Sequence, residues 1–270
     1  MEAKLTDLDC REVALLGHLN LIQFYRESPL WSRGGIVQEE GGVLLYATDS
    51  TFPLMMNGAF RTDDSVEPDV LISRADDFFA GRNRGYSLFV RDGIDDDLGI
   101  AALRLGAAEV VRHPEMICTQ RLPVLSLPAG VEIRRVVTAD DAAHFIEVNA
   151  SAYTVYGMRP EVVYQAFSSV GRMLLPHVVA VVAYVEGKPA AAAVTIASHG
   201  IAGVYWVGTI EAYRGRGLCQ AVVREVTNAG FDLGARLNSL QASVMGEPIY
   251  KKLGYETIFH HRIYVRSRRK

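Results

Sequence analysis

The 270-residue sequence is poor in cysteine, with only Cys10, Cys118 and Cys219. This odd number, without the close spacing of metal ligands, argues against a disulfide framework and a structural zinc site, so we expect reduced thiols and no metal. No apolar run reaches the length of a membrane span, and the first seven residues, MEAKLTD, lack the order of charges followed by apolar residues that is typical of a signal peptide. We therefore expect a cytoplasmic protein with no membrane partner.

Neither sign of charge is in large excess, since the formal net charge is −3. A dedicated nucleic-acid-binding protein usually carries a broad basic surface, so this balance argues against that class. The short basic tail, residues 266–270, is interpreted as an exposed, solvated segment. With 270 residues and a hydrophobic content of 49%, the chain is long enough for about two domains with well-formed cores.

The most informative segment is YRGRGLC, residues 213–219. It lies between a predicted strand, residues 202–210, and a predicted amphipathic helix that begins near Gly217. Glycines at 215 and 217 let backbone N–H groups turn toward a ligand, and the start of a helix attracts negative charge. Arg214 and Arg216 add forked donors that suit phosphate. The segment therefore predicts an anion site, although a plain connecting loop also explains a lone Gly-x-Gly.

Two common phosphate-binding motifs do not fit this segment. A Walker loop needs Gly-x-x-x-x-Gly-Lys-Ser/Thr, and a dinucleotide fingerprint needs a third glycine where Gln220 stands. The segment instead resembles motif A of the GNAT acetyltransferase superfamily, Arg/Gln-x-x-Gly-x-Gly/Ala, with Arg214 at the first position and Gly217 at the fourth. Cys219 at the sixth position departs from the motif, and its side chain is bulkier than the usual glycine or alanine.

A second segment, residues 240–258, resembles the closing β-α-β unit of a GNAT domain. Residues 240–244 alternate as in a strand, Pro248 suits the first turn of a helix, and Gly254 suits its end. Taken together, the two segments identify the chain from about residue 131 onward as GNAT-like.

The other elements of this second half follow the same order. The chain divides near residues 122–130, where prolines and a glycine interrupt the pattern. Thr138 with Asp141 predicts the start of a helix that ends near Tyr153, and Gly230 predicts the end of the helix that begins at Gly217. The remaining predicted elements are strands 131–137, 178–185, 189–198 and 202–210 and a helix over 160–171.

The first half resembles a degenerate copy of the second. Its predicted elements are strands 34–39, 43–47, 56–61 and 85–91 and a helix over 68–81. Residues 101–111 echo residues 249–259, and aligning Gly106 on Gly254 places Ala102 opposite Tyr250, although Leu-Gly is also an ordinary helix stop. Instead of the glycine loop, residues 61–68 carry three carboxylates that would repel a phosphate.

We therefore predict an α/β fold of two tandem GNAT-like domains, each with a mixed, mostly antiparallel sheet flanked by helices. Residues 1–125 would form the degenerate domain, and residues 126–270 would form the catalytic domain that binds acetyl-CoA.

The resemblance also implies the roles of individual residues. Backbone groups of Thr209 and Ile210 would bind the pantetheine arm of acetyl-CoA. The pyrophosphate would lie on the loop and the start of the helix, whose residues are Arg214, Gly215, Arg216, Gly217, Leu218 and Cys219. Tyr250 matches the tyrosine that many members use as a general acid, and an ordinary pKa of about 10 keeps such a phenol protonated at neutral pH. The alternative is that Tyr250 is an ordinary core residue. Ser243 would face the same gap as Tyr250.

The general base and the acceptor are not fixed by the sequence. Glu147, Glu161 and Glu211 are the nearest carboxylates in the family geometry, and each also reads as an ordinary surface residue. The acceptor groove would be lined by residues that also suit a core: Tyr153, Tyr156, Met158, Tyr205 and Trp206. His260 and His261 lie on one predicted strand and point to opposite faces, which argues against a joint metal site.

The predicted function is an acetyl-CoA-dependent N-acetyltransferase, in which a primary amine of a small molecule or a protein attacks the thioester directly. The alternative is a non-catalytic CoA-binding or interaction protein on the same scaffold. The sequence leaves open whether the protein forms a homodimer, and we expect no nucleic-acid partner.

Overall fold

The computed structural model describes residues 9–124 and 126–267. The elements of the first half are α1 Cys10–Glu27, the 3₁₀ helix η2 Ser28–Trp31, β1 Ile36–Glu40, β2 Val43–Ala47, β3 Asn57–Arg61, α2 Pro68–Ala80, β4 Tyr86–Arg91, α3 Asp96–Arg104 and β5 Ala108–Cys118. The elements of the second half are β6 Val131–Arg135, α4 Ala139–Ala152, η3 Tyr153–Tyr156, α5 Pro160–Ala166, η4 Val170–Leu174, β7 Val178–Val185, β8 Lys188–Ser198, β9 Ile201–Thr209, η5 Glu211–Tyr213, α6 Leu218–Asp232, β10 Asn238–Gln241, α7 Glu247–Lys252 and β11 Glu256–Arg266.

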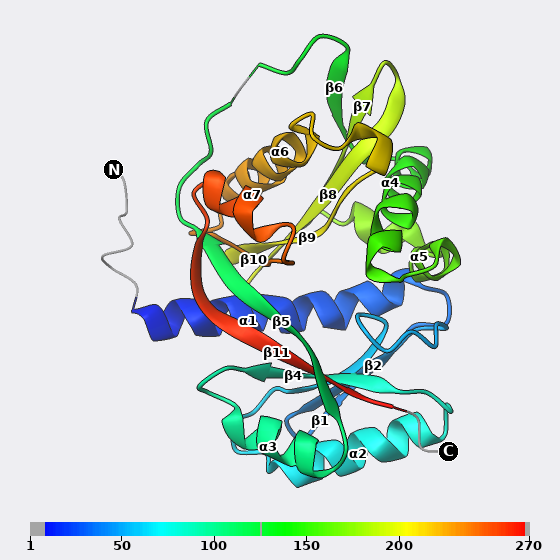
Figure 1. Ribbon diagram of the computed structural model, residues 1–270, viewed down its shortest axis with the longest axis vertical. Coiled ribbons are helices and arrows are strands. Elements are labelled where there is room, and N and C mark those ends of the chain that lie inside the picture. Colours follow the sequence, from blue (N-terminus) through cyan, green and yellow to red (C-terminus); the bar gives the residue numbers. More distant parts are fainter. Residues whose placement is uncertain (1–8, 125, 268–270) are drawn as a thin grey trace.

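All eleven strands form one mixed sheet, in the order β1-β2-β3-β4-β11-β5-β10-β9-β8-β7-β6 (Figure 1). Among the strands of the described residues, only the pairs β3–β4 and β9–β10 are parallel. The predicted α/β class and the tandem arrangement are confirmed, with the sheets of the two halves fused into one.

The two halves exchange their last strands. β11 ends the chain but lies beside β4 of the first half, with Arg266 opposite Tyr86. β5 ends the first half but lies beside β10 of the second, with Cys118 opposite Asn238. The exchanged strands pair with each other in the middle of the sheet, where they run side by side (Figure 1). Outward from this pair the order is β11-β4-β3-β2-β1 on one side and β5-β10-β9-β8-β7-β6 on the other, so the halves repeat one topology, to which the second half adds the edge strand β6.

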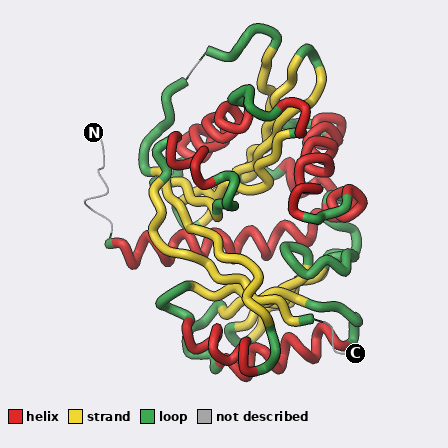
Figure 2. Tube along the Cα trace, viewed as in Figure 1, coloured by secondary structure: helices red, strands yellow, loops and turns green. Residues whose placement is uncertain are grey.

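Helices cover both faces of the sheet (Figure 2). One face packs against α1, α4 and α5 in a core that continues through both halves and contains Phe24, Phe60 and Phe145. The opposite face packs against α2 and α3 in the first half and against α6 and α7 in the second. The shared core and the exchanged strands join the halves.

Local sequence signals explain where several helices begin. Thr138 and Asp141 form a complete capping box at the start of α4, as predicted. The predicted stop of α6 at Gly230 is wrong, because the helix continues to Asp232 and a glycine with a φ of +89°, Gly234, follows it. A Cβ on Gly230 would lie 2.7 Å from the Ala202 Cβ, so this glycine lets the helix approach the sheet closely.

The predicted helix over 160–171 is also too long. α5 ends at Ala166, and a separate 3₁₀ helix spans Val170–Leu174.

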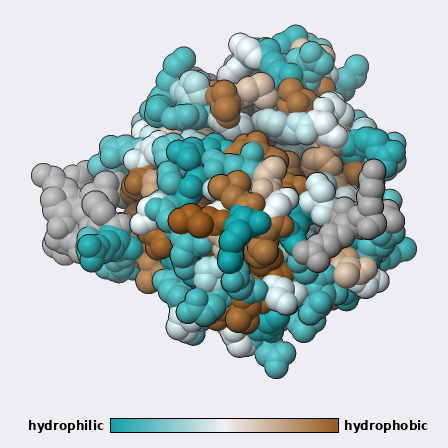
Figure 3. Space-filling view, turned by 60° about the horizontal axis from the view of Figure 1, so that its bottom comes forward, coloured by the Kyte–Doolittle hydropathy of each residue, from teal (hydrophilic) through white to brown (hydrophobic). Residues whose placement is uncertain are grey.

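The surface of the first half is mixed in character, with apolar side chains between polar ones (Figure 3). Its exposed large apolar side chains include Val70, Ile94, Ile100, Leu103 and Val110. Within the described ranges, no helix has the length and apolarity needed to span a membrane.

Candidate functional site

A cleft opens in the second half where β9 and β10 separate. Their parallel pairing covers only Ala202–Gly203 with Asn238–Ser239. Beyond this point lies a cleft of about 380 Å³. It is lined by Ala152, Tyr153, Val155, Tyr156, Val207, Gly208, Thr209, Tyr213, Arg214, Gly215, Gly217, Leu218, Cys219, Gln220, Ser243, Met245, Gly246, Ile249 and Tyr250. Most of the predicted binding residues and the predicted acid therefore lie around one space.

An irregularity in β9 shapes one wall of the cleft. The register with β8 shifts between Ala192 and Val194, which is the mark of a β-bulge. Trp206 at this bulge has a φ of +49°, which is unusual for a bulky side chain. After the bulge, Val207, Gly208 and Thr209 line the cleft.

The glycine loop before α6 presents unpaired backbone donors to the cleft. Gly215 and Gly217 have φ values of +76° and +77°, a conformation that favours glycine. Gly217 is the N-cap of α6 and supplies no capping side chain. In the described part of the chain, the N–H groups of residues 215–220 have no hydrogen-bond acceptor. A Cβ on either glycine would have no neighbour within 4 Å. Open space, free N–H groups and a helix N-terminus together suit an anion.

The two arginines of the loop behave differently. Arg214 is the only residue with a formal charge at neutral pH among those that line the cleft, and its Nε donates to the Thr209 carbonyl oxygen at 3.3 Å. The Arg216 guanidinium instead lies 5.5 Å from the centre of the Tyr213 ring and does not line the cleft. Arg214 is therefore the side chain placed to face an anionic ligand.

Ile210 does not line the cleft. Its N–H donates to the Ala190 carbonyl oxygen at 2.9 Å, and its own carbonyl oxygen accepts from the Tyr213 N–H at 2.9 Å. The Ile210 N–H is therefore not free for a ligand, and of its backbone groups only the carbonyl oxygen, which can accept a second hydrogen bond, is left for the predicted contact with the pantetheine arm.

Tyr250 combines a core position with access to the cleft. Its ring belongs to the core under α6 and α7, and its exposed fraction is 7%. Its hydroxyl has no hydrogen-bond partner among the described residues, although the residue lines the cleft. Burial raises the pKa of Tyr250 well above its ordinary value, and nearby Cys219 acts in the same direction. The phenol therefore keeps its proton across the neutral range.

Cys219 also faces the cleft, and burial raises the pKa of its thiol to about 11. The side chain therefore stays uncharged at neutral pH. A neutral thiol adds no repulsion toward an anion, so the departure from the motif at this position leaves the charge of the loop unchanged.

Ser243 links the two walls of the cleft. Its Oγ accepts from the Tyr156 Oη at 2.9 Å and from the Gly246 N–H at 3.2 Å. Tyr156 belongs to η3, whereas Ser243 and Gly246 belong to the turn before α7. The turn that carries Tyr250 is thus held against the opposite wall.

The predicted bases and acceptor residues are only partly brought together. Glu147, Glu161 and Glu211 are exposed, and none of them lines the cleft. Tyr153 and Tyr156 do line it.

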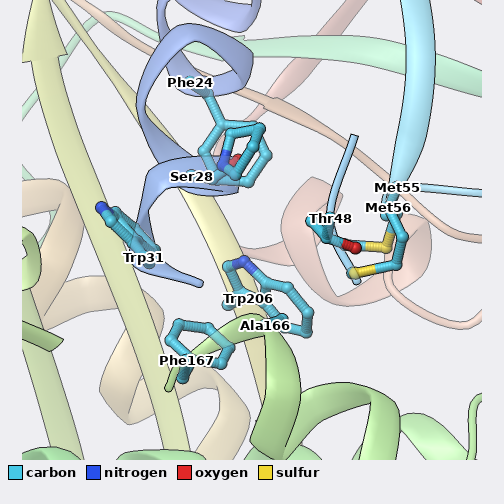
Figure 4. A pocket seen from close by; sticks show the side chains of 10 residues that line it. Phe24, Ser28, Trp31, Thr48, Met55, Met56, Ala166, Phe167 and Trp206 are labelled. Carbon is cyan, nitrogen blue, oxygen red and sulfur yellow. The ribbon is translucent and has the colours of Figure 1, made fainter. Parts of the chain in front are cut away.

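Met158 and Tyr205 are buried in the shared core, where Tyr205 donates to the Asn20 Oδ1 at 2.6 Å, so they do not line an acceptor groove. Trp206 lies in the same core, and its ring centre is 4.8 Å from that of Tyr153. Trp206 also lines a second cavity (Figure 4). That cavity measures about 10 Å³, the size of one water molecule, which is too small for an acceptor.

Sequence reasoning missed several cleft residues, among them Val155, Gln220 and Met245. Gln220 lies directly after the predicted loop, so its position was readable from the start of the helix. The other two come from segments that fold over the cleft, and no local pattern marks them.

In the first half, β3 and β4 separate in the same way, but charged side chains of the protein occupy the space beyond their pairing. β3 and β4 pair only at Gly58–Ala59 with Ser87–Leu88. The ends of these strands carry Arg61 and Arg91, whose guanidinium groups lie 2.7 Å and 2.6 Å from the Asp95 carboxylate. Arg61 also pairs with Asp97, and Arg91 pairs with Asp64. The position that corresponds to the cleft is therefore bridged by the protein's own buried charges.

The comparisons with known proteins agree with this geometry. The family model described as an acetyltransferase (GNAT) domain matches residues 124–252. The structure is similar to that of a GCN5-related N-acetyltransferase from Kribbella flavida, with 22% identity, a TM-score of 0.69 and coverage of 93% of this chain and 95% of that one. A GCN5-related N-acetyltransferase from Sphaerobacter thermophilus shows 15% identity, a TM-score of 0.63 and coverage of 86% and 78%.

A tandem GNAT protein from the clavulanic acid biosynthesis pathway is also similar over its whole length. It shows 12% identity and a TM-score of 0.59, with coverage of 97% of this chain and 98% of that one. At these identities the likeness shows the fold alone. No curated protein matches the sequence.

Proposed function

We propose that this protein is an acetyl-CoA-dependent N-acetyltransferase, because residues 124–252 match the acetyltransferase (GNAT) domain model and the fold is similar to that of a tandem GNAT protein. It transfers the acetyl group to a primary amine of a small molecule or a protein by direct attack on the thioester. One observation supports this proposal most directly. A single cleft is lined by the free N–H groups at the start of α6, by the Arg214 side chain and by Tyr250.

The residues of the cleft fit acetyl-CoA. The N–H groups of residues 215–220 and the Arg214 side chain would hold the pyrophosphate, where the two glycines leave open space. Val207, Gly208 and Thr209 would lie along the pantetheine arm. The cleft volume of about 380 Å³ falls within the usual range of roughly 300–1,000 Å³ for ligand pockets.

The chemistry asks little of the protein beyond orientation and one proton. Acetyl-CoA supplies an activated acyl carbon when bound. Tyr250 Oη holds a proton that it donates toward the sulfur as the carbon–sulfur bond breaks. The amine nitrogen bonds to the acyl carbon as the carbon–sulfur bond breaks. Because none of the three predicted carboxylates lines the cleft, the proton of the amine leaves to water, and water returns a proton to Tyr250 Oη.

Activity itself is tested by measuring thiol release from acetyl-CoA with a panel of primary amines. Release that depends on the amine supports the transferase. Tight CoA binding without thiol release on any small or protein amine would favour the non-catalytic alternative instead.

We expect acetyl-CoA to bind at one site per chain. The cleft of the second half has free N–H donors, whereas its counterpart in the first half is bridged by Arg61, Arg91 and Asp95. Calorimetric titration of the full chain should give a stoichiometry of about one. Two equivalent sites would show that the first half also binds the cosubstrate.

Replacing Gly217 by valine should weaken acetyl-CoA binding by about 30-fold, which corresponds to about 2 kcal/mol. The backbone of Gly217 has a φ of +77°, which a β-branched residue resists, and the new side chain would enter the space of the pyrophosphate. The matched control is Gly234→Val, because Gly234 has a φ of +89° and open space but lies at the far end of α6. Unchanged affinity in a folded Gly217→Val variant would refute the proposed phosphate site.

A further inference from the structure

We propose that Gly246 is a positioning residue for Tyr250: the absence of a side chain at 246 fixes where the Tyr250 hydroxyl lies in the cleft. This inference rests on the proposed function, in which that hydroxyl is the proton donor. A Cβ on Gly246 would lie 2.7 Å from the Cε2 and 3.3 Å from the Cζ of Tyr250, and 3.3 Å from the Ser243 Oγ, so the Tyr250 ring makes the closest contact. The Cζ carries the hydroxyl, so any side chain at 246 must displace the end of the ring that acts.

The backbone does not explain the glycine. Gly246 has a φ of −81° and a ψ of −36°, an ordinary right-handed helical conformation that every residue adopts. It is the N-cap of α7 but supplies no side-chain hydrogen bond there. The close approach of the Tyr250 ring is therefore the feature that requires a glycine at this position.

The ring has one direction in which to yield. The Tyr250 N–H donates to the Gly246 carbonyl oxygen at 3.0 Å, and its carbonyl oxygen accepts from the Tyr255 N–H at 3.0 Å, so the backbone is held on both sides. The ring packs in the core beside Leu253 and Tyr255, with the centre of the Tyr255 ring 6.0 Å away. Because the other sides are packed, displacement by a new Cβ moves the phenol toward the cleft.

The glycine is itself held against the opposite wall. Its N–H donates to the Ser243 carbonyl oxygen at 3.0 Å and to the Ser243 Oγ at 3.2 Å. The same Oγ accepts from the Tyr156 Oη at 2.9 Å. The chain of contacts Tyr156–Ser243–Gly246–Tyr250 thus sets the distance between the Tyr250 hydroxyl and the far wall of the cleft.

The first test is the turnover of Gly246→Ala. We expect a loss of about tenfold to a hundredfold in kcat, the usual cost of a small misplacement of a reacting group, with acetyl-CoA affinity unchanged within a few fold. The matched control is Gly81→Ala, because Gly81 also has an ordinary φ of −62° but has no neighbour within 4 Å of a built Cβ. That control should keep wild-type turnover.

The second test separates positioning from a general structural effect. In the Tyr250→Phe background the hydroxyl is gone, so Gly246→Ala should cause no further loss of kcat, while it lowers the melting temperature equally in both backgrounds. An equal loss of kcat in both backgrounds would overturn the proposal. So would wild-type turnover in Gly246→Ala.

The failure of the proposed function has a different signature. Wild-type turnover in Tyr250→Phe alone would remove the acid and, with it, the need to position it. Slow turnover in Tyr250→Phe together with wild-type turnover in Gly246→Ala would overturn the positioning alone. Where Gly246→Ala does not fold, Ser243→Ala loosens the same turn without adding atoms. It should lower kcat several-fold, and only when the Tyr250 hydroxyl is present, and wild-type turnover would overturn the proposal.

Discussion

Replacing Tyr250 by phenylalanine should lower the turnover number roughly ten- to a thousandfold, the usual contribution of a positioned acid, while acetyl-CoA affinity stays within a few fold. Only the hydroxyl is removed. In the folded chain burial holds the pKa of this phenol well above its ordinary value, so the proton is present throughout the neutral range. Turnover is measured at saturating acetyl-CoA with a good acceptor, under conditions in which chemistry limits the rate.

The same variant also tests the structural explanation of Tyr250. Its hydroxyl has no partner among the described residues, so its removal should leave the free energy of unfolding nearly unchanged. The matched control is Tyr255→Phe. Tyr255 lies in the same core, and its Oη bonds to the Thr227 Oγ1 at 2.6 Å, so this variant should lose about 1 kcal/mol of stability and keep its turnover. Wild-type turnover in Tyr250→Phe would make water the proton source.

The conformation of the glycine loop was predictable because its signal is local. Gly215, Gly217 and the helix that follows are adjacent in sequence, and their φ values depend on the loop alone. The bond made by the Ile210 N–H was not predictable, for the opposite reason. The Ile210 N–H donates to the Ala190 carbonyl oxygen in β8. Strand periodicity does not predict which backbone groups will bond to a neighbouring strand.

The acceptor wall was predicted less well because a bulge decides it. Strict alternation along β9 does not predict the extra residue near Trp206, which changes the faces of the residues after it. Trp206 consequently lies in the same core as Tyr205, which precedes the bulge, rather than along the cleft. Both are aromatic and β-prone, so composition alone cannot separate the two positions.

The exchange of β5 and β11 lies beyond sequence reasoning for a physical reason. Both strands satisfy the same hydrogen-bonding pattern, and their pairing joins residues such as Ile263 and Val111, far apart in the chain. α1, in contrast, was missed although its signal is readable. Asp9 caps the helix, and the buried Val13 and Leu21 recur at helical spacing.

Replacing Asp95 by asparagine should lower the free energy of unfolding by about 3–5 kcal/mol. Asp95 is the shared partner of Arg61 and Arg91, and the side chains of all three residues are 5% exposed or less. Asparagine keeps the size but leaves two buried guanidinium groups without their common carboxylate. Chemical denaturation measures the loss. The matched control is Asp64→Asn, because the Asp64 side chain is 69% exposed and pairs only with Arg91, so its loss should cost about 1 kcal/mol or less.

The effect of Asp95 should also depend on pH in a defined direction. Burial alone would raise its pKa, but hydrogen bonds from Arg91 and Arg61 outweigh burial and hold the pKa of Asp95 well below its ordinary value. A carboxyl whose pKa is lower in the folded chain stabilises it fully above the unfolded pKa of about 4, and this stabilisation is lost as the pH falls toward the folded pKa.

The stability difference between wild type and Asp95→Asn should therefore be constant near neutral pH and shrink below about pH 4. Asp141 also has a lowered pKa, and its contribution cancels in the difference between the two proteins, whereas Asp97 shares Arg61 with Asp95 and contributes to that difference. Curves that stay parallel into acid would show that the ionised Asp95 does not hold the first half together.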